Sequence, residues 1–321
     1  MIRASMIGLG LVVLGLAWPA SAQVKYTLVD LGTVGGGSSS ANTVDNRSQG
    51  VGGVLTGDAA ITHAFPGKVK ANDSTDLSAL GGTNSSAQAD PGTLRGSNSL
   101  VDAVDFDEHG QMANQSVGSS SVDGDTATHA MSWDASANTK DLGTLGGTNS
   151  SAFGSNCVQK VVGSSETANE TTDAFVWDSA HGMQDLGTLG GSFGQSNAIN
   201  CSGTIVGMSS LAGDMQIEAF LYADGTMRDL GNLGGSFSQA NDINDSGDVV
   251  GSSNTTGDMG VHAFVWTPRG GLQDLNNLIA ADSGWDLNSA NGINERGTII
   301  GVGTINGEGH AFALIPVHTE D

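Results

Sequence analysis

The sequence predicts an all-β fold, a six-bladed β-propeller with four-stranded blades. The phrase Asp-Leu-Gly-Thr-Leu-Gly-Gly occurs word for word at residues 141–147 and 185–191, with close variants elsewhere. Asp-Leu pairs begin at residues 30, 76, 141, 185, 229 and 274, which gives intervals of 46, 65, 44, 44 and 45 residues. The chain also contains 49 glycines, which favour tight turns over helix bundles. A repeat of about 45 residues is typical of one propeller blade.

Within one repeat, four segments at 239–244, 248–253, 262–267 and 271–275 have the pattern of strands. Val249, Val250, Phe264, Val265 and Trp266 favour β-structure, and short runs containing Gly, Pro, Asp or Ser separate the segments. A solenoid of parallel strands is the alternative. Its coils are usually shorter and lack a four-strand meander, so we favour the propeller.

The two ends of the chain are expected to share one blade. Segments 289–294, 298–302 and 310–315 supply three strands, and 26–31 has the pattern of the missing fourth. Pairing of these segments would close a ring of six and remove exposed strand edges. We therefore expect a single domain over 23–321. The long interval holds an insertion near 83–99, expected as a surface loop or as a loop covering one mouth of the ring.

The first residues have the layout of a secretory signal peptide over 1–22. Arg3 precedes an apolar run at 7–17, and small residues lead to expected cleavage near Ala22. The run is too short to span a bilayer, so we expect a secreted protein, periplasmic or extracellular, without membrane insertion. The net charge of -23 argues against nucleic acid as a partner and favours solubility, with attraction of cations as the alternative. We expect a monomer.

Two phrases recur along the chain. The first, His-Ala-Phe-Val-Trp at 262–266, is echoed at 63–65, 173–177, 218–220 and 310–312. The second, Asn-x-x-Gly followed by a β-branched pair and Gly, occurs at 244–251 and 294–301. Both phrases resemble those of the bacterial extracellular HAF-repeat family. The resemblance covers the expected mature chain apart from the insertion and implies an exported repeat protein of unassigned biochemistry. The chain departs from it at Met131, which replaces the Phe, and at 157–160, which lacks the turn Gly.

A titratable side chain opens the third strand of every repeat: His63, His129, Asp173, Glu218, His262 and His310. Such residues ligate zinc or iron when several lie within ~2.0 to 2.3 Å of one ion. Third strands lie at least ~10 Å beyond the innermost ones, because strands are ~4.8 Å apart, so one ion cannot reach two of these positions. We expect no metal site here and a structural hydrogen-bonding role, with acid–base chemistry by one member as the alternative.

Another column of equivalent positions lies on the first strands: Asn42, Asn197, Asn241 and Asn291. Near the axis these amides are candidates for binding a polar ligand, and packing between innermost strands is the alternative. Trp133, Trp177 and Trp266 recur in the third strands and are expected in the core. Trp285 lies outside that register and is a candidate platform for a sugar.

Cys157 and Cys201 are the only cysteines and fall near the same turn of neighbouring repeats, so they are candidates for one disulfide. Oxygen-bearing side chains also gather near a turn: Asp242, Asn244, Asp245 and Asp248. Their spacing departs from the EF-hand and lacks its later Glu, so a hairpin turn is favoured and calcium is the alternative. No other cofactor is indicated.

The mature chain contains no Gly-x-Ser-x-Gly elbow, His-Glu-x-x-His, P-loop or Cys-x-x-Cys motif. We therefore expect a non-catalytic scaffold that binds an extracellular protein or glycan. The alternative is a secreted hydrolase or lyase acting on an extracellular polysaccharide or other polymer.

Overall fold

The computed structural model describes residues 25–33, 38–44, 46, 49–55, 62–68, 99–106, 112–122, 124, 126–134 and 138–317. The expected signal peptide, the Asp-Leu pair at 76 and all but residue 99 of the expected insertion lie outside this set. The described residues form an all-β fold, as predicted. Short 3-10 helices accompany the strands, among them η2 (Thr256–Asp258) and η3 (Leu275–Asn277).

The strands of the described residues form six groups, which we name units after their first strands. The β2 unit contains β2 (Ser38–Val44), β3 (Gln49–Leu55) and β4 (Thr62–Lys68). The β5 unit contains β5 (Ser99–Phe106), β6 (Met112–Ser121), β7 (Thr128–Asp134) and β8 (Thr139–Gly143). The β9 unit contains β9 (Gly146–Ser155), β10 (Val161–Thr167), β11 (Thr172–Asp178) and β12 (Gly182–Gly187).

The next units continue the pattern. The β13 unit contains β13 (Gly190–Ile199), β14 (Ile205–Leu211), β15 (Ile217–Ala223) and β16 (Thr226–Gly231). The β17 unit contains β17 (Gly234–Ile243), β18 (Val249–Thr255), β19 (Val261–Thr267) and β20 (Gly271–Asp274). The β21 unit contains β21 (Trp285–Ile293), β22 (Ile299–Ile305), β23 (Glu308–Val317) and the N-terminal β1 (Lys25–Gly32).

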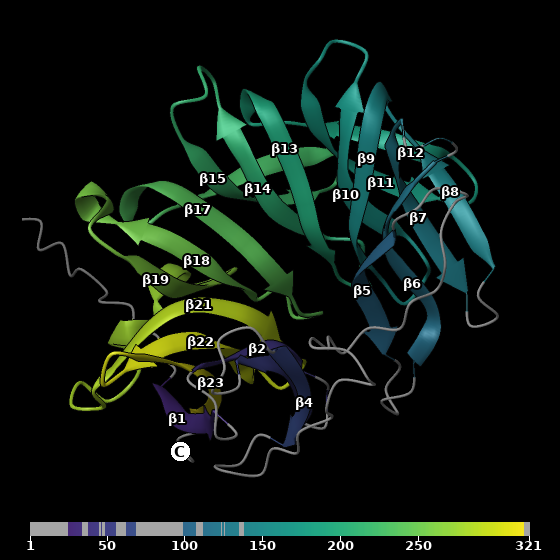
Figure 1. Ribbon diagram of the computed structural model, residues 1–321. Coiled ribbons are helices and arrows are strands. Elements are labelled where there is room, and N and C mark those ends of the chain that lie inside the picture. The colour runs from purple at the N-terminus through teal and green to yellow at the C-terminus, as the bar shows by residue number, and fades with distance from the viewer. Residues whose placement is uncertain are drawn as a thin grey trace, which may run out of the picture.

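The first and last strands of the chain share a sheet, as the sequence predicts. β1 pairs antiparallel with β23 from Lys25–Val317 to Gly32–Ala311. Within the other units, each strand pairs antiparallel with the next one along the chain. The units follow one another in chain order around the molecule (Figure 1). First strands contact each other from β5 through β9, β13, β17 and β21 to β2. A closed ring of six stays a prediction.

The core lies between neighbouring units, and its largest members come from the repeated Phe. Phe175, Phe220, Phe264 and Phe312 are completely buried. Phe264, for example, packs in a cluster with Val206 and Ala219 of the preceding unit. Burying one such ring stabilises the fold by about 1.5 to 3 kcal/mol. The Gly of the second phrase makes room for the ring, since a Cβ on Gly251 would lie 2.8 Å from Phe264.

The Asp-Leu-Gly phrase ends the outer strand with a turn held by its own Asp. In the β9 unit, the backbone N–H of Gly187 donates to Oδ1 of Asp185 over 2.7 Å, and Gly187 has a φ of +74°. Thr188 then donates to the carbonyl of Gly191, and the chain crosses to β13 at Gly190, whose φ is +104°. The left-handed φ values explain the glycines. The phrase thus forms the connection from the outer strand of one unit to the first strand of the next unit.

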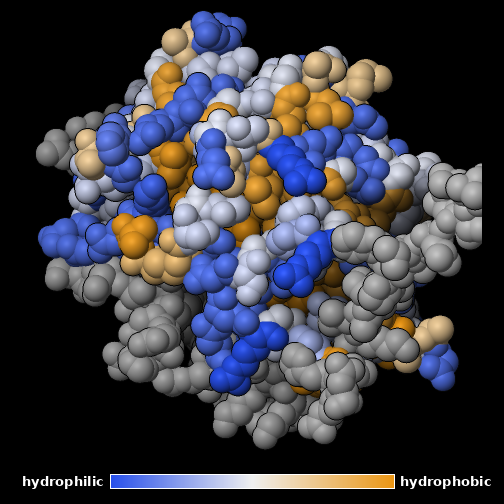
Figure 2. All heavy atoms as spheres, turned by 180° about the vertical axis from the view of Figure 1, so that it is seen from behind, coloured by the Kyte–Doolittle hydropathy of each residue, from blue (hydrophilic) through white to orange (hydrophobic). Residues whose placement is uncertain are grey.

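Two ends of the molecule follow from this topology. The crossover end carries the Gly-Gly passages and the loops between second and third strands, and the Asn-turn end carries the turns between first and second strands. Figure 2 shows apolar residues toward the middle of the rear face, with hydrophilic residues around them.

Candidate functional site

The third-strand histidines are hydrogen-bonded to the Asp of the Asp-Leu pair in their own sheet. Nδ1 of His262 lies 2.7 Å from Oδ2 of Asp274, and Nδ1 of His129 lies 2.9 Å from Oδ2 of Asp141. His310 makes the same contact across the chain ends, 3.1 Å from Asp30 on β1. This geometry is what a structural role predicts. The side chain of His63 lies outside the described set.

Two units carry a carboxylate in place of the histidine. Glu218 is almost completely buried and accepts a hydrogen bond of 2.8 Å from the Ser238 hydroxyl, and another from the Asn232 amide. Burial raises the pKa of Glu218. Burial also raises the pKa of Asp173, and the neighbouring charge of Asp185 acts in the same direction. These carboxyl groups hold protons to a higher pH than free ones do. Glu218 contacts Ser238 of the next unit, whereas Asp173 lies beside Asp185 of its own unit.

Trp285 begins β21, because η3 replaces the Gly-Gly passage at this crossover. Its ring is half-buried and meets His310 and Phe312 edge to face, with centroids 6.0 and 6.3 Å apart. A Cβ on Gly303 would lie 3.1 Å from the ring, so glycine makes room for it. Much of Trp285 therefore packs into the core, and only its remaining exposed part is available as the predicted sugar platform.

The inner asparagine column joins units to each other. Nδ2 of Asn197 donates to the carbonyl of Ala240, that of Asn241 to Ala290 and that of Asn291 to Ala41. Their Oδ1 atoms accept from Gln195, Gln239 and Ser289. Asn42 is exposed. The contacts of the first three favour the packing alternative, and a binding role for this column stays untested.

A second asparagine ladder runs along the Asn-turn end. Asn156 donates through Nδ2 to the carbonyl of Asn200, and Asn200 donates in turn to Asn244, over 2.9 and 3.0 Å. Oδ1 of Asn200 closes its own turn by accepting from the Thr204 N–H at 2.9 Å. Gly203 takes a φ of +88°, as the hairpin interpretation predicts, and Gln159 takes +61° where the turn Gly is missing.

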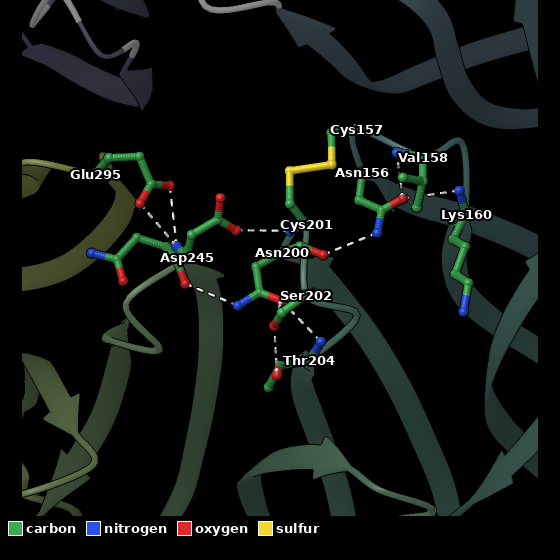
Figure 3. Close-up of a disulfide and its surroundings, with 11 residues drawn as sticks. Asn156, Cys157, Val158, Lys160, Asn200, Cys201, Ser202, Thr204, Asp245 and Glu295 are labelled. Carbon is green, nitrogen blue, oxygen red and sulfur yellow. Dashed lines mark hydrogen bonds between the residues drawn. A yellow bond between two sulfur atoms is a disulfide. The ribbon is translucent and has the colours of Figure 1, made fainter.

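The residue after each of these asparagines joins the same units again (Figure 3). The N–H of Cys201 donates to Oδ1 of Asp245 over 2.8 Å, and the N–H of Asp245 donates to the carboxylate of Glu295. At the equivalent place between the β9 and β13 units, Cys157 and Cys201 form a disulfide, with Cα atoms 5.5 Å apart. A covalent bond thus occupies the position of a hydrogen bond. The sequence offered these cysteines as candidates for a disulfide and left their pairing open. It did not indicate that the bond would replace a hydrogen bond between units.

The candidate calcium residues are engaged in the turn and in the joint between units. Both oxygens of the half-buried Asp242 carboxylate accept backbone N–H groups, from Ile243 in its own strand and from Ile293 in the next unit, each over 2.8 Å. Asp248 donates its N–H to Asn244. Among the described residues, no group of three or more His, Cys, Asp or Glu is arranged to hold a metal ion. Calcium binding stays untested.

Two exposed methionines at the crossover end were missed by the sequence reasoning. Met215 is 85% exposed and Met259 is 87% exposed, in the loops after β14 and β18. Their signal in the sequence is the phrase Gly-Asp-Met at 213–215 and again at 257–259. Equivalent positions in adjacent units place both at the same end. Methionine is used frequently at protein surfaces that bind several different partners.

Known proteins resemble this chain in fold alone. No family model matches it, and no curated protein matches it. Solved structures that match include the β-propeller domain of the trilobed protease from Pyrococcus furiosus, with 9% identity over 88% of this chain and 85% of that chain, and a TM-score of 0.48. A TolB protein from Agrobacterium tumefaciens has 10% identity over 94% of this chain and all of that chain, also at 0.48.

A gluconolactonase from Xanthomonas campestris has 11% identity over 92% of this chain and 95% of that chain, with a TM-score of 0.46. These likenesses assign no activity to this chain. The resemblance to HAF-repeat sequences rests on the two recurring phrases. Within the described part of the chain, no helix is both long enough and apolar enough to cross a membrane.

Proposed function

We propose that the chain is an exported six-bladed β-propeller of HAF-repeat type, closed as a ring. Two observations support this architecture. β1 completes the sheet of the last three strands, and the first strands contact one another in series from β5 to β2 by way of β21. Contact between the β2 and β5 units would complete the ring, as strand edges favour pairing or covering.

The proposed function is that of a non-catalytic scaffold that binds an extracellular protein or glycan at the crossover end. The observation that carries it is the pair of methionines, Met215 and Met259, exposed at equivalent positions of adjacent units. Methionine is flexible and polarisable, so it adapts to the surface of a partner. Burying each one on binding would contribute about 1.5 to 3 kcal/mol before the cost of association.

The same end also carries the residues best suited to acid–base chemistry. His129, His262 and His310 each contact an aspartate of their own sheet, which supports a structural role for them. The histidine–aspartate contact is repeated in three units. A repeated contact is expected of an element that builds each unit, whereas a catalytic group is needed only once.

The test uses the purified chain on a glycan array and against the proteins of the extracellular medium, with turnover measured on the same glycans. We expect saturable binding without turnover, weakened at least about tenfold by the double variant Met215→Gln, Met259→Gln. The matched control is Val158→Gln, since Val158 is 62% exposed at the Asn-turn end. Equal binding by the double methionine variant and the unaltered chain, or turnover of a polymer, would overturn the proposal.

A further inference from the structure

A cavity of about 390 Å³ opens at the crossover end of the β9 unit. Its lining includes Gly146, Gly147, Thr148, Glu166, Glu170 and Thr172. The volume lies in the ~300 to 1,000 Å³ range of small-molecule sites. At the equivalent positions of the β13 and β17 units an aspartate covers the glycines, and this difference explains why the cavity forms in the β9 unit.

In the β13 unit, an aspartate of the loop covers the Gly-Gly passage. Oδ1 of Asp214 accepts from the Ser192 N–H and from the Ser210 hydroxyl, each over 2.7 Å. A Cβ on Gly191 would collide with this carboxylate. The β17 unit repeats the arrangement, because Asp258 accepts from the Ser236 N–H over 2.7 Å and from the Asn254 amide over 3.0 Å.

In the β9 unit the carboxylate comes from a different position. Glu166, equivalent to Ser210 and Asn254, accepts from the N–H groups of Thr148 and Asn149, each over 3.1 Å, and from the Asn149 amide over 3.0 Å. The equivalent of Asp214 is Glu170, which has the same left-handed backbone, with a φ of +64°. Glu170 is exposed and borders the cavity instead of covering the glycines.

Because Glu166 covers the glycines instead of Glu170, the carboxylates of both residues line one cavity. The lining contains no cationic side chain. Three hydrogen bonds fix Glu166, so its charge is held in place beside the cavity. Thr148 and Thr172 in the lining carry hydroxyl groups that can also accept hydrogen bonds. Alkylammonium and guanidinium groups carry a positive charge and several N–H donors, which is the chemistry that carboxylates bind best.

We propose that this cavity binds an organic cation through an alkylammonium or guanidinium group, held between Glu166 and Glu170. The occupant is either a free small amine or a basic side chain of a partner. This inference names a ligand class at the proposed binding end, but it does not depend on Met215 or Met259.

Isothermal titration at moderate ionic strength tests it, with agmatine and an arginine-containing peptide as probes. We expect one saturable site and at least tenfold weaker binding in Glu170→Gln. The double variant Glu166→Ser, Glu170→Asp rebuilds the residues of the β13 unit, and we expect it to fill the cavity, keep its melting temperature within a few degrees and lose binding. Tighter binding of the peptide than of agmatine would identify a partner's side chain, and the reverse would identify a free amine.

Because the whole chain is acidic, the control must separate a site from general attraction. Glu308→Gln removes an equal charge from an exposed carboxylate at the same end, and we expect unchanged binding. Equal weakening in Glu308→Gln and Glu170→Gln, or unchanged binding in the double variant, would overturn the inference. Loss of cation binding with intact methionine-dependent binding would leave the scaffold proposal standing, and the opposite pattern would leave the cation site standing.

Discussion

Cys157 is bonded to Cys201 at the position where the next two joints between units use a backbone N–H and a side-chain carboxylate. The disulfide spans 44 residues of sequence, so reducing it frees a long loop in the unfolded chain. Loop entropy gives about 4 kcal/mol for a closure of this length. We expect Cys157→Ser, Cys201→Ser to lower the free energy of unfolding by about 2 to 4 kcal/mol in denaturant titrations.

The matched variant is Cys157→Ser, Cys201→Asp, which offers the N–H of residue 157 the carboxylate that Asp245 offers to Cys201. We expect it to recover about 1 kcal/mol, the usual net value of a hydrogen bond. If both double variants are as stable as the unaltered oxidised protein, the disulfide does not hold this joint.

Asp242 makes the stability depend on pH. Burial raises its pKa from 3.8 to about 7, and the charge of Glu295 adds to this effect. Between these values the folded protein binds a proton that the unfolded chain releases, so stability falls as pH rises from about 4 to about 7. The slope from this group is about 1.4 kcal/mol per pH unit.

To test this pH dependence, the free energy of unfolding is measured from pH 4 to 8 for the protein and for Asp242→Asn. The variant leaves one of two backbone N–H groups without its acceptor, which costs about 1 to 3 kcal/mol at low pH. Its dependence on pH should nevertheless be flatter. Parallel curves for the two proteins would show that Asp242 does not titrate in this window.

Deletion of residues 25–32 should unfold the chain or lower its melting temperature by tens of degrees. The deletion removes the strand paired with β23, including the buried Leu31 and the partly buried Tyr26 and Leu28. Burial of such side chains contributes about 1.5 to 3 kcal/mol each, against a typical total of about 5 to 15 kcal/mol. Calorimetry gives the result, and removal of 318–321 is the control. An unchanged melting transition would contradict the role of β1.

Gly231 tests the turn in the repeated phrase. Its φ is +79°, and no atom would meet an added Cβ within 4 Å, so a substitution there changes backbone strain alone. We expect Gly231→Ala to cost about 1 to 2 kcal/mol and Gly231→Asn to cost less, because asparagine tolerates the left-handed region. Denaturant midpoints give the comparison. Equal losses in the two variants would mean that the cost does not come from φ.

The repeat made much of the fold predictable. The four strands expected in 239–275 are β17 to β20, and the segment at 26–31 is β1, because alternating β-favouring residues and turn glycines recur with one period. The hairpin role of Asn200 and Asn244 followed from local backbone chemistry. Each of these inferences needed only residues within one repeat.

Contacts between units could not be predicted in the same way. The hydrogen bond from Asn197 to the carbonyl of Ala240, and the one that Ile293 donates to the Asp242 carboxylate, depend on how two sheets face each other. A period in the sequence does not specify this. The cavity beside Glu170 is harder to predict from the sequence than these hydrogen bonds. It arises because Glu166, at the position of Ser210, covers the glycines in place of Glu170, which stands at the position of Asp214. Only the side-chain directions reveal this difference.

The pairing of β1 with β23 also sets an order of assembly. A chain made from its amino end produces β1 first and its partner last, with 275 residues between Gly32 and Glu308. Until β23 is made, the backbone N–H and C=O groups of β1 that hydrogen-bond to β23 have no partner strand. A product that stops before β23 would present two free strand edges, one on β1 and one on β22. Free strand edges pair with other chains, so a prematurely terminated copy is the form of this protein most prone to aggregate.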